Sequence, residues 1–258
     1  MEKASRFIIA PAMNMKTLLE TTASTKAIDC SHDFRASMDP LPQNHFRLLY
    51  LEPTSSHKNS AIHCRLATFE LQSAPTYEAL SYTWGEAVLS HEIICNGSSL
   101  QVTSNLHGAL QYLRQIDGER ILWIDALCIN QTNDQERMAQ VHIMKDIYSK
   151  SNHVVIWLGK DTDDDKTAFA ILEQYRKLFA ERGQVDIGPL ETAYYKLPLP
   201  AEESQDWTAL IKLFQKPWFQ RIWVIQEAVV CLPTFPFPYI FSFQGVQVVQ
   251  RRLLNPHF

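Results

Sequence analysis

The chain has 258 residues, 46% of them hydrophobic and 20% charged, so it can bury a substantial core. Its net charge of −4 provides no basic field that would attract nucleic acid or an anionic membrane surface. The five cysteines include no Cys-x-x-Cys pair and the histidines show no metal spacing. This pattern favours reduced thiols in a cytosolic or nuclear protein over a disulfide framework or a zinc site, and we expect a cytoplasmic protein.

The N-terminal part predicts a leader followed by two strands. Residues 1–42 are rich in Thr, Ser, Ala and Met without sustained periodicity, which predicts a disordered leader. The apolar stretch Phe7–Ala12 is too short for a signal peptide or a membrane span. The segments Phe46–Leu51 and Ile62–Leu71 then predict strands.

A further strand, a hairpin and a helix are predicted next. Tyr77–Gly85 reads as a strand that breaks at its last two residues. Asn96-Gly97 between two short alternating segments is the strongest short hairpin signal. Asn105 opens a helix with one apolar stripe, formed by Leu106, Ala109, Leu110 and Leu113.

The segment from residue 120 to residue 160 predicts a parallel crossover unit. Ile121–Asp125 and Val154–Leu158 are short apolar runs typical of buried strands. Between them, Glu136–Lys150 has helical spacing, with Asn133 as its N-cap and an apolar stripe of Met138, Val141, Met144, Ile147 and Tyr148. Parallel strands need both faces covered, so this unit predicts an α/β fold.

Polar residues follow both strands of this unit. Ligands of parallel sheets collect beyond the carboxyl ends of the strands. The polar residues at these positions are Asp125, Asn130, Gln131, Asp134, Lys160 and Asp161. An alternative interpretation is that Asp125 and Asn130 only close a turn and cap a helix.

The acidic run Asp161–Asp165 resembles the start of a calcium loop, but the rest of the pattern fails. Lys166 replaces the turn glycine and Leu172 occupies the position of the bidentate glutamate. The run therefore predicts an acidic helix N-terminus and no metal site. Ser204 caps a later helix whose apolar residues are Trp207, Leu210, Ile211 and Phe214.

A last helix is predicted from Pro217, and it carries Glu227 beside apolar neighbours. Glu227 lies one turn after Trp223, and a carboxylate packed on indole loses solvation, which raises its pKa. Such a group can act as an acid or base or stabilise a developing cation. The alternative is a glutamate that faces water or pairs with Arg221.

Three sequence blocks resemble the fungal heterokaryon incompatibility (HET) domain. They are YEALSYTWG at 77–85, LWIDALCINQ at 122–131 with WLG at 157–159, and PWFQRIWVIQE at 217–227. The resemblance places a HET domain at residues 43–230. It is followed by a divergent tail rich in proline and aromatic residues at 231–258, where a truncated, inactive paralogue is one interpretation.

The resemblance implies an effector in non-self recognition and programmed cell death. HET domains are distantly similar to TIR domains, so it also implies an α/β fold with a mainly parallel, flavodoxin/TIR-like sheet and an added antiparallel hairpin. Some TIR domains cleave nicotinamide from NAD, which makes NAD a candidate substrate while no cofactor is expected. An alternative is a non-enzymatic adaptor that self-associates or binds a protein partner.

On this resemblance, Glu227 is the candidate catalytic residue. The candidate substrate-binding residues are Ser81, Tyr82, Trp84, Asp125, Asn130, Gln131 and Trp223. Glu227 would stabilise the ribosyl cation, Asp125 or Asn130 would hold ribose hydroxyls, and a tryptophan would stack on a base. The sequence has no glycine-rich phosphate loop, so a Rossmann-type redox use of NAD is not expected.

Overall fold

The computed structural model describes residues 34–35, 38–54, 61–181, 204–221, 227 and 246–250. Its strands are β1 (His45–Leu51), β2 (His63–Glu70), β3 (Glu78–Tyr82), β4 (Leu89–Cys95), β5 (Ser98–Thr103), β6 (Arg120–Trp123), β7 (His153–Trp157) and β8 (Val246–Gln250). Its helices are α3 (Ser104–Leu113), α4 (Asp125–Cys128), α5 (Asp134–Lys150), α6 (Asp163–Glu181), α8 (Gln205–Phe214) and the 3-10 helix η1 (Pro217–Gln220).

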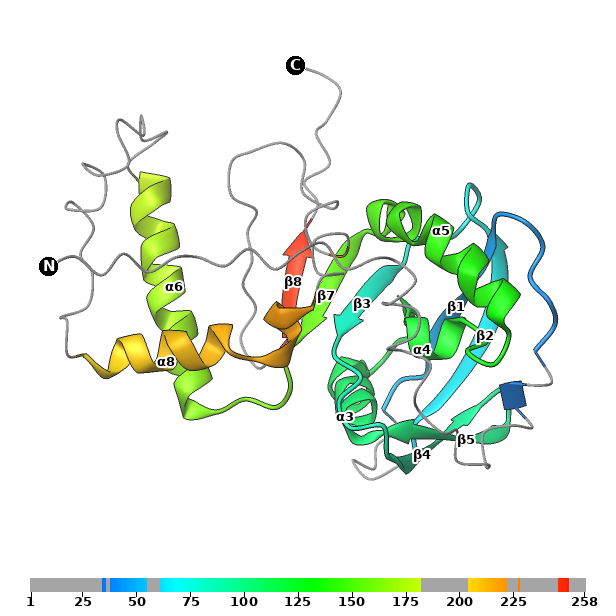
Figure 1. Cartoon of the computed structure of the whole chain (residues 1–258), viewed down its shortest axis with the longest axis horizontal. Helices are drawn as coiled ribbons and strands as arrows, with labels where there is room; N and C mark the ends of the chain where they lie inside the picture. The colour runs from blue at the N-terminus through cyan, green and yellow to red at the C-terminus, as the bar shows by residue number, and fades with distance from the viewer. Residues whose placement is uncertain are drawn as a thin grey trace, which may run out of the picture.

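The described strands form one sheet in the order β5-β4-β2-β1-β6-β3-β7-β8 (Figure 1). At its centre, β3 runs parallel to both β6 and β7, and β2 also runs parallel to β4. The other four pairings within the described residues are antiparallel. The predicted α/β class is confirmed, but the sheet is mixed, and its antiparallel pairings outnumber the parallel ones, so the prediction of a mainly parallel sheet is not met.

The crossover unit of β6, α5 and β7 is present, with β3 inserted between its two strands. β3 pairs with β6 through Glu78 and Ala79, and with β7 along its whole length from Glu78 to Tyr82. The two strands are therefore parallel without being neighbours. The sequence shows that β3 exists, but strand periodicity carries no information about where a strand inserts.

The predicted hairpin is confirmed. Asn96 and Gly97 join β4 to β5 with φ angles of 50° and 78°. Two successive positive φ values are what a type I′ turn requires, and Asn and Gly are the residues that tolerate them.

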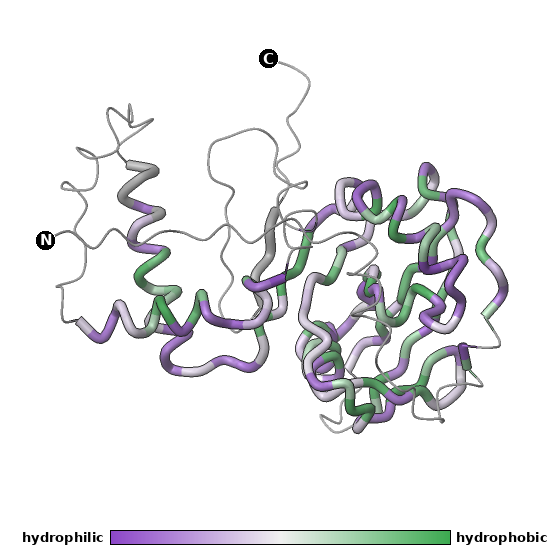
Figure 2. The backbone as a smooth tube through the Cα atoms, in the orientation of Figure 1, coloured by the Kyte–Doolittle hydropathy of each residue, from purple (hydrophilic) through white to green (hydrophobic). Residues whose placement is uncertain are grey.

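Helices cover the sheet and bury its apolar side chains. α3 buries the four predicted stripe residues, Leu106, Ala109, Leu110 and Leu113. α5 buries Met144, Ile147 and Tyr148 as predicted, but Met138 is 58% exposed, and the buried residues nearer its N-terminus are Glu136 and Gln140. A second cluster of buried residues joins α6 to α8, and Figure 2 shows hydrophobic segments both in the strands and on α6.

Parts of the predicted leader and tail can be compared with the structure. Phe34 is buried in the core and Arg35 donates to the carbonyl oxygens of Ala126 and Ile129, whereas residues 1–33 lie outside the described residues. In the tail, β8 pairs with β7. No helix of the described residues is long and apolar enough to cross a membrane.

Candidate functional site

The ends of two adjacent parallel strands, β3 and β6, bring the first candidate residues together. Ser81 and Tyr82 are the last residues of β3, and Asp125 begins α4 shortly after β6 ends. Side chains alternate between the faces of a strand, so Ser81 and Tyr82 point to opposite faces of the sheet.

Glu227 lies at this strand end and is held by charged and polar partners that include Ser81 and Arg221. The Ser81 hydroxyl donates to Glu227 Oε2, and Arg221 makes a bidentate contact, with Nη1 3.1 Å from Oε2 and Nη2 2.8 Å from Oε1. Trp218 Nε1 donates to Ser81 Oγ over 2.7 Å. Glu227 is 2% exposed, so the alternative of pairing with Arg221 is confirmed, and the alternative of facing water is wrong.

Asp125 is the second carboxylate of the site. Its Oδ2 accepts from Trp84 Nε1 at 3.0 Å and its Oδ1 accepts from the backbone N–H of Ala126 at 2.7 Å. Burial, and then the negative charge of Glu227, raise the pKa of Asp125 to about 6, while the Trp84 hydrogen bond and Arg221 oppose the rise. The two carboxylates are thus close enough to influence each other.

Tyr82 and Trp84 differ in exposure. Tyr82 is 2% exposed, and burial followed by the charge of Asp125 raises the pKa of its hydroxyl well above the ordinary value. Trp84 is 47% exposed, so one part of its indole remains available while its N–H holds Asp125. Trp223 lies outside the described residues.

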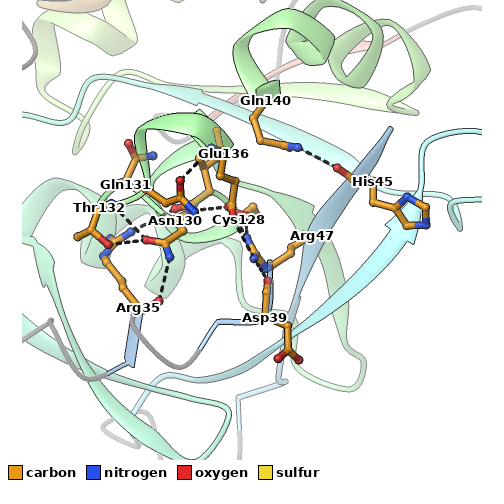
Figure 3. A network of polar contacts seen from close by, with 12 residues as sticks. Arg35, Asp39, His45, Arg47, Cys128, Asn130, Gln131, Thr132, Glu136 and Gln140 are labelled. Atoms are coloured by element: carbon orange, nitrogen blue, oxygen red, sulfur yellow. Dashed lines mark hydrogen bonds and ion pairs between the residues drawn. The ribbon is translucent and has the colours of Figure 1, made fainter. Parts of the chain in front are cut away.

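Asn130 and Gln131 are occupied by contacts within the chain (Figure 3). Asn130 Nδ2 donates to the carbonyl of Arg35 at 2.9 Å, and its Oδ1 accepts from the hydroxyl of Thr132 at 2.7 Å. Gln131 Nε2 donates to the carbonyl of Asp125 at 2.9 Å. These contacts agree with the alternative in which Asn130 closes a turn. Gln131 holds the turn that carries Asp125.

A buried ion pair supports this turn and was missed by the sequence interpretation. Arg47 Nη1 lies 2.6 Å from Glu136 Oε1, and both side chains are 5% exposed. The same carboxylate accepts the backbone N–H of Asn130 at 2.7 Å, and Arg47 donates to the carbonyl of Cys128 at 3.1 Å (Figure 3). Arg47 lies inside the apolar strand β1, and a charged residue in such a strand needs a buried partner. This pattern was the signal that could have predicted the ion pair.

A family model described as heterokaryon incompatibility protein (HET) matches residues 77–227, which is more than half of the chain. The chain belongs to the HET family. It is 30% identical over 259 residues to heterokaryon incompatibility protein 6, OR allele, of Neurospora crassa. The match covers 87% of this chain but 36% of that relative, so the chain spans about a third of the relative's length. No solved structure matches.

A groove of about 480 Å³ is lined by residues of α3 and of the end of β7. Its lining residues are Glu86, Val88, Ser90, Ser104, Asn105, Gly108, Trp157 and Lys160. Neither Asp125 nor Glu227 lines it. Asn105 connects the groove to the site, because its amide donates to the carbonyl of Thr83, beside Trp84, and accepts from Trp157 Nε1 at 2.8 Å.

The described part of the HET domain holds no group of three or more His, Cys, Asp or Glu side chains placed to bind a metal ion. The acidic run Asp161–Asp165 leads into α6, as predicted. Asp165 accepts from Thr162 and from Lys216 Nζ at 2.8 Å, as expected for an acidic helix start.

The carboxylate pair combines two different environments. Glu227 is fixed by a guanidinium and a hydroxyl, so it offers a preorganised negative charge. Asp125, with a pKa of about 6, can exchange a proton near neutral pH. Carboxylates whose environments differ in this way are able to divide cation stabilisation and proton transfer between them.

Proposed function

We propose that this HET domain is an effector of fungal heterokaryon incompatibility and cell death, and that its Asp125–Glu227 centre cleaves nicotinamide from NAD. The observation that carries this proposal is the meeting of Asp125 and Glu227 beyond the adjacent ends of β6 and β3. The role in incompatibility is supported by the family and by the Neurospora crassa relative.

The proposed reaction is a hydrolysis that needs only NAD and water. The bond between the ribose anomeric carbon and the nicotinamide nitrogen breaks, and its electron pair leaves with nicotinamide. The negative charge of Glu227 stabilises the ribosyl cation that remains. Water attacks the cation, and the proton that it loses passes to the Asp125 carboxylate, which gives nicotinamide, ADP-ribose and a proton.

Two other side chains fit supporting roles in this reaction. Trp84 is exposed on one side and bonded to Asp125 on the other, so its ring can stack on nicotinamide next to the proposed base. Ser81 and Arg221 fix the Glu227 carboxylate and so act as positioning residues. Asn130 is a weaker candidate for ribose binding than Asp125, because its amide is occupied by Arg35 and Thr132.

The test is NAD hydrolysis by the purified chain and by its Glu227→Gln variant. Gln keeps the size of the side chain and removes the charge, so we expect release of nicotinamide to fall about 100-fold or more. Glu119→Gln is the matched control, because Glu119 forms an exposed pair with Arg65 away from the site. Thermal unfolding of both variants separates a loss of chemistry from a loss of fold.

Cellular NAD distinguishes the enzyme from a signalling adaptor. The chain and its Glu227→Gln variant are expressed in a fungal host while viability and NAD are followed. We expect NAD to fall before viability falls, and only with the wild-type glutamate. Toxicity that persists with constant NAD, or hydrolysis that survives the substitution, would refute the catalytic part and leave the role of an adaptor.

A further inference from the structure

Cys64 and Cys95 face each other across two neighbouring strands. Cys64 on β2 is the direct register partner of Cys95 on β4, in a parallel pairing. Adjacent strands lie about 4.8 Å apart. This spacing falls within the separation of about 4.4–6.8 Å between Cα atoms that disulfides use.

The two thiols lie in the same buried region and influence each other's ionisation. Both cysteines are free and buried. The pKa of the Cys64 thiol is raised, first by a hydrogen bond with the Cys95 thiol and then by burial. Cys64 Sγ lies 3.6 Å from the carbonyl oxygen of Ile94, the residue before Cys95. As direct register partners, the two side chains project from the same face of the sheet.

The strand junction that holds the two cysteines is short. Within the described residues, β2 and β4 are in register at two residue pairs, His63 with Ile94 and Cys64 with Cys95. β4 and β5 form the outer hairpin of the sheet. Edge elements with few connections open locally more easily than a sheet centre. Such an opening gives buried thiols access to a small oxidant and lets one of them ionise.

We propose that Cys64 and Cys95 are an oxidation site, at which peroxide forms an intramolecular disulfide that fastens the β4–β5 hairpin to β2. Peroxide first oxidises one thiolate to a sulfenic acid and is reduced to water. The second thiolate then attacks that sulfur, the S–O bond breaks, and a second water leaves. Two thiols and one peroxide thus give one disulfide and two water molecules.

Cys128 provides the matched control. It is a third buried free cysteine, but its Sγ accepts the backbone N–H of Ile124 at 3.4 Å, within its own turn. A full-length chain with Cys30→Ser, Cys128→Ser and Cys231→Ser keeps the proposed pair. A chain with Cys30→Ser, Cys64→Ser and Cys231→Ser keeps Cys95 and Cys128 instead.

Both chains are treated with hydrogen peroxide, alkylated, digested without reductant and examined by mass spectrometry. We expect the first chain to yield a peptide pair joined through Cys64 and Cys95, to lose both free thiols, and to regain them with dithiothreitol. The second chain should yield no internal link. Free thiols in both chains, or a link between Cys95 and Cys128, would overturn the proposal.

Two further measurements test whether the bond forms in the folded protein. We expect urea below the unfolding transition to speed the reaction and hydrogen exchange in β4 and β5 to slow once the disulfide is present. Linkage that appears only in globally unfolded protein, or faster exchange in the oxidised hairpin, would contradict an oxidation site of the native fold. These readouts do not depend on NAD, so they are independent of the proposed catalytic activity.

Discussion

At the strand ends, two carboxylates share one nearby guanidinium. Arg221 pairs in a bidentate manner with Glu227, and its charge also lowers the pKa of Asp125. Because burial and Glu227 together outweigh that effect, Asp125 keeps a pKa of about 6. Arg221 therefore pairs directly with Glu227 and only partly offsets the rise in the pKa of Asp125. The proposed division of roles, with Glu227 as a fixed charge and Asp125 as a proton acceptor, depends on this asymmetry.

The raised pKa of Asp125 predicts a pH dependence of stability. An unfolded aspartate titrates near pH 3.9, so between about pH 4 and pH 6 the folded state binds more protons than the unfolded state. The free energy of unfolding therefore falls as pH rises through this window, by up to about 3 kcal/mol for a shift of two units. Asp125→Asn removes this contribution, so the variant should gain stability relative to wild type between pH 4 and pH 7.

Urea unfolding of both proteins at pH 4 and pH 7 measures this difference. Asp134→Asn is the control, because the Asp134 side chain is 81% exposed and pairs with Arg137 at the surface. If the difference in the free energy of unfolding between wild type and Asp125→Asn were the same at both pH values, the raised pKa of Asp125 would be ruled out.

At the residue scale, the sequence predicts positions better than partners. Asp125 follows from the rule that ligand-binding residues lie beyond the carboxyl ends of parallel strands. The contact of Ser81 with Glu227 joins residues far apart in the chain, and no local pattern encodes it. Asn130 sits at the same strand end and closes a turn instead, because nearby backbone groups compete successfully for its amide.

At the element scale, the N-terminal turn of α5 fastens that helix to the sheet through a charge. Asn133 caps the helix as predicted and accepts the N–H of Glu136 at 3.2 Å. Glu136 then points inward to Arg47 on β1. The prediction places Met138 in the buried stripe because hydrophobic spacing counts only apolar residues. It therefore cannot show that the charged Glu136 is the buried residue in this turn. α3, whose buried face contains no charge, matches its prediction at every stripe residue.

Breaking the buried pair should destabilise the protein strongly. Glu136→Gln leaves the Arg47 charge buried without its partner, and such a loss costs about 3–5 kcal/mol. Glu119→Gln, in the exposed pair with Arg65, should cost less than about 1 kcal/mol. Urea unfolding of the two variants provides the comparison. If they lost similar amounts of stability, the Arg47–Glu136 pair would not hold α5 to β1 as described.

At the scale of the whole molecule, two apolar clusters are joined by few residues. The large cluster fills the sheet, and the small one joins α6 to α8, which lie beyond the β7 and β8 edge (Figure 1). Leu158 and Phe219 pack against both clusters, and Lys216 pairs with Asp165 at 2.8 Å. The chain then enters η1, where Trp218 donates to Ser81, and continues to Arg221, which pairs with Glu227. The small unit is therefore connected to the candidate site.

This arrangement predicts that α6 and α8 open as a unit of their own. Leu213 is 1% exposed in the small cluster, and Leu213→Ala should weaken that cluster by about 2–5 kcal/mol. We expect faster amide hydrogen exchange in α6 and α8, with exchange in β1, β3 and β6 almost unchanged, because low-energy openings follow local packing. Leu80→Ala, in the large cluster at β3, should instead speed exchange in the sheet. Equal acceleration in both regions by Leu213→Ala would mean that the molecule unfolds as one cooperative unit, and that the site does not depend on a separately opening support.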